Sequence, residues 1–138
     1  MPGVMFGAGG NAKTIMSVSI YYEAKRATPL SPVEKEKVSE LVRKYSVDKA
    51  IEKYMETGEG LNWESFGFYD EPYDPGVILK GSTSLPDNTP EAVWIGTQLW
   101  CSALSEIRRA VKNAAWEVQV EDRQLWWDDS KQAYDPTK

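Results

Sequence analysis

The residues of this chain that are best suited to chemistry are carboxylates gathered in one short segment. Asp70, Glu71 and Asp74 alternate with aromatic and proline residues, and carboxylate oxygens of this kind can bind Ca²⁺ or Mg²⁺. Their spacing does not match an EF-hand loop, and carboxylates beside proline and glycine usually form solvated turns. Two carboxylates could also serve as acid and base in glycoside hydrolysis, but they would have to be held about 5–10 Å apart across a cleft.

Two features of the composition exclude other kinds of active site. The chain contains no histidine, so Ser-His-Asp and Cys-His arrangements and histidine-containing zinc sites are ruled out. Its one cysteine, Cys101, falls in an apolar helical pattern, where we expect a buried thiol. We therefore predict a protein that is not an enzyme, with no catalytic residue, no metal and no cofactor, in the reducing cytoplasm.

The beginning of the chain differs from the rest. Residues 1–15 are rich in glycine, and we expect them to form a leader or flexible segment ahead of a single α+β domain over residues 16–138. Within the leader, residues 7–14 nearly match the phosphate-binding pattern GxxxxGKS/T, but Ala12 stands where the last glycine belongs. A strand rather than a helix is predicted next, which argues against a nucleotide site. No apolar run has the length of a membrane span, so we expect no membrane partner.

The charge distribution points to a partner that is a protein. The chain has 16 lysine and arginine residues against 21 aspartate and glutamate residues, a formal net charge of −5, which argues against direct nucleic-acid binding. Residues 54–79 hold six carboxylates and no basic residue, so they should create a field that attracts a basic protein. Aromatic residues, the usual anchors of interfaces, lie among them. The partner-binding residues predicted in this segment are Glu59, Trp63, Glu64, Asp70, Glu71, Tyr73 and Asp74.

The same aromatic residues could instead close the edge of a core, with the carboxylates merely solvated. A further anchor is predicted near the C-terminus, where Trp126 and Trp127 must point to opposite faces of a strand. Because Leu125 and Trp127 share a face, we predict Trp126 to be exposed and to bind the partner. A homodimer formed through this last strand is the alternative role for Trp126.

The periodicity of the apolar residues predicts the elements that carry these side chains. Alternation over residues 17–25 predicts a strand. Ser31 and Glu34 have the spacing of a capping box, and Pro32 suits the first turn, so a helix is predicted to begin there. The further elements predicted are a short helix over 47–57, strands at 66–69 and 77–85 paired as a hairpin, a long helix from 89, and strands at 116–120 and 125–127, with residues from 135 onward frayed.

This order predicts an α+β fold with an antiparallel sheet and two main helices on one face. A ferredoxin-like βαββαβ core with an extra C-terminal strand fits it best, and another strand order is the alternative. In size and charge the chain resembles the small acidic immunity proteins and antitoxins of bacteria, which would imply that it neutralises a basic toxin enzyme.

Two other functions compete with this interpretation. The first is a DNA-mimic or phage-type inhibitor, which would present spaced carboxylates to a DNA-binding groove. The second is a small-molecule-binding protein or a carboxylate-dependent enzyme, with a pocket lined by Trp94, Trp100 and Trp116.

Overall fold

The computed structural model describes residues 18–138, and the predicted leader over 1–15, including the phosphate-loop-like segment 7–14, lies outside the described residues. A four-stranded antiparallel sheet forms its centre, with the strand order β2-β1-β3-β4. The strands are β1 (Ser19–Lys25), β2 (Val77–Ser84), β3 (Ala115–Val120) and β4 (Arg123–Gln124). Strand β1 pairs with β2 on one side and with β3 on the other, so β2 and β3 run parallel to each other with β1 between them.

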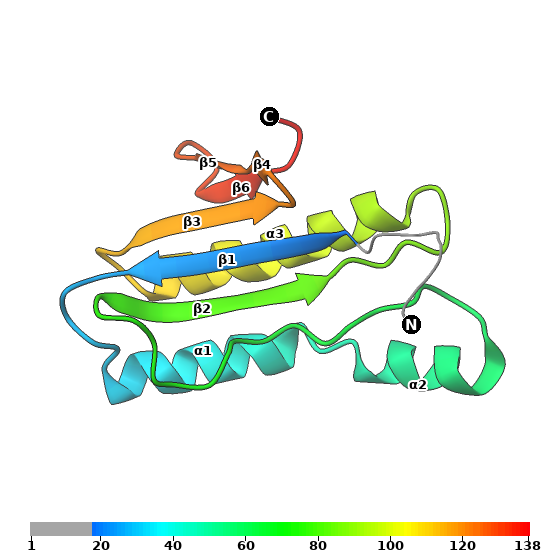
Figure 1. Ribbon diagram of the computed structural model, residues 1–138, viewed down its shortest axis with the longest axis horizontal. Helices are drawn as coiled ribbons and strands as arrows, with labels where there is room; N and C mark the ends of the chain where they lie inside the picture. Colours follow the sequence, from blue (N-terminus) through cyan, green and yellow to red (C-terminus); the bar gives the residue numbers. More distant parts are fainter. Residues whose placement is uncertain (1–17) are drawn as a thin grey trace, which may run out of the picture.

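Three helices accompany the sheet, and their ends follow the local sequence signals. They are α1 (Pro32–Lys44), α2 (Asp48–Thr57) and α3 (Ala92–Ala110). The predicted capping box is present at α1, where Ser31 and Glu34 exchange hydrogen bonds between side chain and backbone. Helix α2 ends at Gly58, whose left-handed backbone (φ 74°) suits glycine. Figure 1 shows α3 running behind the long strands, α1 beside β2, and α2 at the far end of the molecule.

The alternation predicted for the first strand is confirmed. Ile20, Tyr22 and Ala24 are buried against the helical layer, whereas Tyr21 on the opposite face is 42% exposed. The aromatic rings continue the core away from β1: Tyr22 stacks on Phe66 at 4.8 Å between centroids, and Phe66 stacks on Trp100 at 5.1 Å. Trp100 is fully buried, so α3 is fixed to the sheet through this row of rings.

The α+β class and the antiparallel sheet are as predicted, but the ferredoxin-like element order is not observed. Residues 66–69 form no strand, so α1 and α2 are followed directly by β2, and the predicted hairpin is reduced to one backbone bond, Tyr69 N–H to the carbonyl of Lys80 at 2.8 Å. The reason is that side chains take the polar groups that a ladder would use. The Tyr22 hydroxyl donates to the carbonyl of Gly67 at 2.6 Å, and the Glu64 carboxylate accepts the Ser84 N–H.

The end of the chain also differs from the prediction. Residues Trp126–Asp128 form β5 and residues Ala133–Asp135 form β6, and the two make a separate antiparallel hairpin. This hairpin lies beyond β3 in Figure 1, and its strand β6 contacts α3. Asp135, from which fraying was predicted to begin, is the last residue of β6 and is only 7% exposed. No helix among residues 18–138 combines the length and the apolar composition needed to cross a bilayer.

Candidate functional site

The structure separates the predicted acidic residues into two groups. Asp74 accepts a backbone hydrogen bond from Val77, the first residue of β2, whereas Glu64 binds Ser84, the last residue of that strand. An eight-residue strand spans about 23 Å, so the acidic groups at its two ends do not form one contact patch. Asp70 and Glu71 are in the same group as Asp74, at the start of β2. Glu59 is in the same group as Glu64, at the end of that strand.

Several of these carboxylates already have partners within the chain. Glu71 lies 3.8 Å from Lys35 in the first turn of α1, and Glu59 lies 3.7 Å from Lys53 on α2. Both pairs are exposed, so they are weak and leave the carboxylates available to solvent. Glu64 differs, because its carboxylate accepts the backbone N–H of Ser84 at 2.7 Å and so caps the edge of β2.

The predicted aromatic anchors have different surroundings. Trp63 packs edge-on against the buried Trp100 ring at 5.7 Å, which makes it part of the core margin. Tyr73 is half-buried and donates its hydroxyl to the carbonyl of Tyr69; burial, together with nearby Glu71, raises the pKa of the Tyr73 hydroxyl. Trp126 is 55% exposed while Trp127 packs on Tyr134, so the predicted exposure of Trp126 is confirmed.

A surface that differs from the predicted acidic segment lies at the end of the molecule that carries α2. The loop after α2 is tied to the loop before α3: Asn62 donates to Asp87 at 2.8 Å and accepts from the Asp87 N–H at 2.8 Å, while Asn88 donates to the carbonyl of Gly60 at 3.0 Å. These bonds hold α2 and the first turn of α3 at the same end of the structure. We call this surface, residues 48–64 and 87–95, the α2 end.

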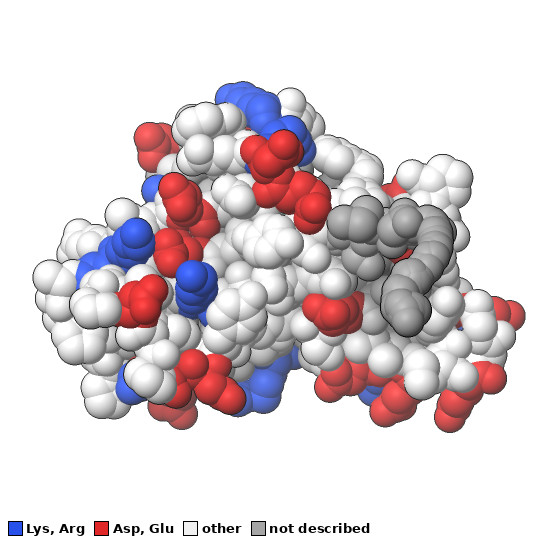
Figure 2. Space-filling model, viewed as in Figure 1, with Lys and Arg blue, Asp and Glu red and all other residues white. Residues whose placement is uncertain are grey.

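The α2 end exposes apolar side chains among unpaired carboxylates. Met55 is 79% exposed, and Trp94 and Ile95 in the first turn of α3 are 42% and 38% exposed. Within residues 18–138 no ion pair involves the following exposed carboxylates of this surface: Asp48, Glu52, Glu56, Glu64, Asp87 and Glu91. Figure 2 shows acidic side chains gathered over α2, at the lower right of the view.

The apolar part of this surface was not predicted from the sequence. Met55 follows Val47, Ile51 and Tyr54 at helical spacing, and such an apolar side of a helix is normally buried, but α2 has no fully buried residue. Trp94 falls outside the stripe of α3 that includes Ala92, Leu99 and Trp100, and this displacement was the available signal that it is exposed. Ile95 lies three residues after Ala92 and four before Leu99, so its spacing gave no such signal. Trp94 also lies about 24 Å along α3 from the helix end that leads to Trp116, so Trp94, Trp100 and Trp116 line no common pocket.

The thiol of Cys101, which lies beside a cavity, is not activated as a nucleophile. The cavity has a volume of about 380 Å³ and lies between α3, Tyr45 and the residues of β6. Burial raises the pKa of the Cys101 thiol to about 12, which keeps the thiol protonated. Lys44 and Tyr45 both bind the Glu106 carboxylate and lower its pKa, so the charged groups here satisfy one another.

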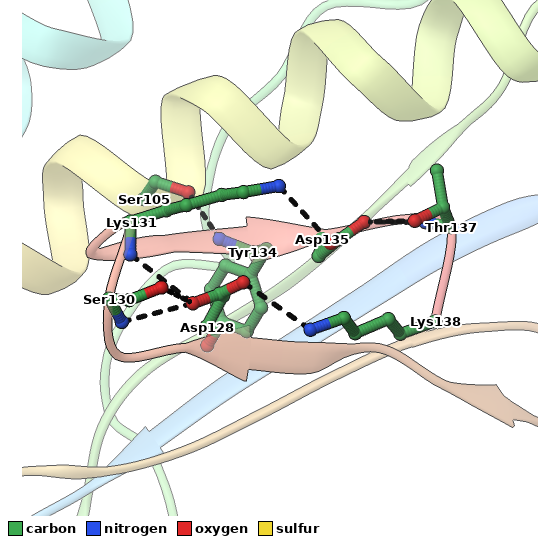
Figure 3. A network of polar contacts seen from close by, with 8 residues as sticks. All are labelled: Ser105, Asp128, Ser130, Lys131, Tyr134, Asp135, Thr137 and Lys138. Carbon is green, nitrogen blue, oxygen red and sulfur yellow. Dashed lines mark hydrogen bonds and ion pairs between the residues drawn. The ribbon is translucent and has the colours of Figure 1, made fainter.

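The polar residues of the C-terminal hairpin form a network that organises the chain (Figure 3). The Asp128 carboxylate accepts from the Ser130 hydroxyl at 2.7 Å and from the Lys131 N–H at 3.2 Å, and Lys138 reaches back to it at 3.4 Å. These contacts, the Ser130 hydroxyl first, lower the pKa of Asp128 to about 2. Asp135 binds Thr137 in the same way. Both carboxylates are thus used to hold turns.

Among residues 18–138 no group of three or more histidine, cysteine, aspartate or glutamate side chains is placed to hold a metal ion. No family model, curated protein or solved structure matches the chain. The fold and the surface together describe a small α+β protein whose most distinctive exposed feature is an acidic and apolar end.

Proposed function

We propose that this chain is a binding protein without enzymatic activity, of the immunity-protein or antitoxin type, which neutralises a basic toxin enzyme by covering it with the α2 end. The observation that supports the proposal is the exposure of Met55, Trp94 and Ile95 on a surface whose carboxylates largely lack cationic partners. Protein interfaces commonly combine apolar anchors at the centre with a polar rim.

The two components of this surface have different roles. The carboxylates of the α2 end would attract a basic protein over the distance at which charges act in solution, about 10 Å at moderate salt, and would raise the association rate. Met55 and Trp94 would then be buried and would slow dissociation. Of the residues predicted from the sequence, Glu59 and Glu64 belong to this contact. Trp63 supports it from the core, whereas Asp70, Glu71, Tyr73, Asp74 and Trp126 lie elsewhere.

The test begins with capture of a cytoplasmic partner at low salt and continues with the purified partner. A triple variant, Glu52→Lys, Glu56→Lys and Glu91→Lys, reverses carboxylates that bind no other side chain among residues 18–138. Glu64 is left unchanged because it caps β2. We expect the affinity to fall by about tenfold or more, with most of the loss in the association rate. Inhibition of the partner's enzymatic activity should be lost in parallel.

A matched control has the same change of net charge at the other acidic group. The variant Asp70→Lys, Glu71→Lys and Asp74→Lys should bind the partner within about threefold of the wild type at moderate salt, because its charges lie far from the contact. Equal losses in both variants would contradict a contact at the α2 end. A partner that is displaced by DNA would instead support the DNA-mimic alternative.

A further inference from the structure

A second cleft has a charge opposite to that of the chain as a whole. It has a volume of about 320 Å³, at the small end of the range for ligand sites, and it lies where α3 passes into β3 and meets the β5–β6 turn. The lining residues that can donate hydrogen bonds or carry positive charge are Arg108, Arg109, Lys112, Trp116 and Trp127. We call this cleft the basic cleft. Asp129, the one carboxylate among its lining residues, leaves the cationic side chains in excess.

The cations of the basic cleft form no direct ion pairs within residues 18–138, although the Glu106 carboxylate is near enough to Arg109 for that guanidinium to help lower its pKa. None of the ion pairs between side chains of residues 18–138 involves Arg108, Arg109 or Lys112, although nine other lysine and arginine residues pair with carboxylates. Residues 1–17 contain no aspartate or glutamate that could supply a partner. Cations at the C-terminal end of a helix complement the helix dipole, which is a structural reason for their presence. Three cationic side chains around one cleft, in a protein of net charge −5, also create a local positive field that attracts an anion.

Neutral contacts hold the two guanidinium groups in place. Arg108 lies over the Trp127 ring at 4.2 Å from its centroid and donates to the Tyr134 hydroxyl at 3.1 Å. Arg109 donates to the carbonyl of Gln132 at 2.6 Å. Each guanidinium has five N–H donors, so most of them are left for another acceptor, and the groups are positioned before a ligand arrives.

One lining residue of the cleft, Trp116, carries an unsatisfied hydrogen-bond donor. The indole Nε1 of Trp116 is shielded from solvent and has no acceptor among the described residues. A buried N–H without a partner costs about 1–3 kcal/mol, so an oxygen that enters beside Trp116 would remove an existing penalty. This observation is independent of the charge of the cleft.

We propose that the basic cleft binds a small molecule through an oxyanion group, a phosphate or a carboxylate, held by Arg108, Arg109 and Lys112, with the indole of Trp116 as an additional donor. The site does not depend on the proposed partner, because the α2 end lies near the other end of α3. Charge-assisted bonds from guanidinium groups to phosphate and carboxylate are among the strongest hydrogen bonds in proteins.

The test is a titration of the full chain with inorganic phosphate, phenyl phosphate and benzoate, followed by the indole N–H signals in NMR spectra, with Trp116→Phe used to assign the Trp116 signal. We expect saturable shifts of the Trp116 and Trp127 signals. Lys112→Glu and Arg109→Gln should each weaken binding by about tenfold. Tighter binding of phenyl phosphate than of benzoate would identify the group as phosphate, and the reverse order would identify it as carboxylate.

The control is Lys49→Glu on α2, which changes the net charge by the same amount as Lys112→Glu at an exposed position remote from the cleft. It should keep the wild-type affinity within about twofold. The proposal is overturned if no probe gives a saturable shift up to about 10 mM at low salt, or if Lys112→Glu and Lys49→Glu weaken binding equally.

Discussion

Helix α2 and the β5–β6 hairpin are both short elements, but the rest of the molecule holds them in different ways. Helix α2 has ten residues, a glycine cap and an apolar side, and yet none of its residues is fully buried. Each strand of the hairpin has three residues, and yet Tyr134 and Asp135 are buried. The hairpin is fixed to α3 by Arg108 and Ser105, which contact Tyr134 and Trp127.

The comparison shows that local signals and tertiary anchoring are separate properties. The signals in α2 determine that a helix forms and where it ends, because capping and periodicity act within a few residues. Its weak attachment leaves an apolar side free, which suits a surface that binds a partner and accepts a cost in local stability. The hairpin has weak local signals and depends on contacts with residues 20–30 positions away.

Removing one aromatic ring from each element should give the largest difference. Tyr134→Ala deletes a buried ring that contacts Trp127 and Arg108, and we expect it to lower the free energy of unfolding by about 3–5 kcal/mol. Tyr54→Ala on α2 removes a half-buried ring and should cost about 1 kcal/mol or less. Urea unfolding at pH 7 measures both. Equal costs would show that α2 is anchored as firmly as the hairpin.

A pair of serines on α3 tests one contact of the hairpin more finely. Ser105 and Ser102 each donate to the carbonyl four residues earlier, but only Ser105 also accepts the Tyr134 N–H, at 2.9 Å. Ser105→Ala leaves that buried N–H unpaired and should cost about 1–3 kcal/mol. Ser102→Ala, at an exposed position, should change stability by less than about 0.5 kcal/mol. Thermal unfolding of the two variants against wild type gives the comparison, and a Ser102→Ala cost as large as that of Ser105→Ala would rule out the hairpin contact as the cause.

The sequence predicted the elements whose signals are local. The strand around Tyr22, the capping box at Ser31 and the long helix with Trp100 were all placed correctly, because period and capping chemistry are visible in adjacent residues. The strand expected at 66–69 failed because the Gly67 carbonyl binds the Tyr22 hydroxyl, 45 positions away, and no local pattern records that bond.

The candidate surfaces were predicted less well than the fold. Counting charges found the acidic segment, but it could not show that β2 would separate Asp74 from Glu64 by its full length. The exposure of Trp126 was predictable from alternation. The basic cleft was not, because Arg108 and Trp127 come from elements whose packing no spacing in the sequence specifies.

Acid should destabilise the hairpin more than it destabilises α2. The effect should be smaller than that of Tyr134→Ala or of Ser105→Ala. The pKa of Asp128 is lowered to about 2, chiefly by Ser130, and the pKa of Asp135 is lowered by Thr137. A lowered carboxyl pKa stabilises the folded state above the ordinary value of about 3.9. That contribution is lost as the pH falls from about 4 to about 2. The Trp127 indole signal, followed by NMR from pH 7 to pH 2, should therefore report loosening before the signals of α2.

The variant Asp128→Asn separates the contribution of Asp128 to the acid effect from that of Glu34. The pKa of Glu34 is also lowered to about 2, chiefly by its contacts with Arg26. Asp128→Asn should melt below the wild type at pH 7 and close to it at pH 2, because most of the stability that the lowered pKa provides is lost once the pH has fallen to that pKa. The neighbouring Asp129→Asn, whose exposed carboxylate makes no bond within residues 18–138, should follow the wild type at every pH. If the Asp128→Asn difference is the same at pH 7 and pH 2, the ionised carboxylate does not hold the turn, and the hairpin is then anchored by the contacts that Tyr134 makes with Ser105 and Arg108.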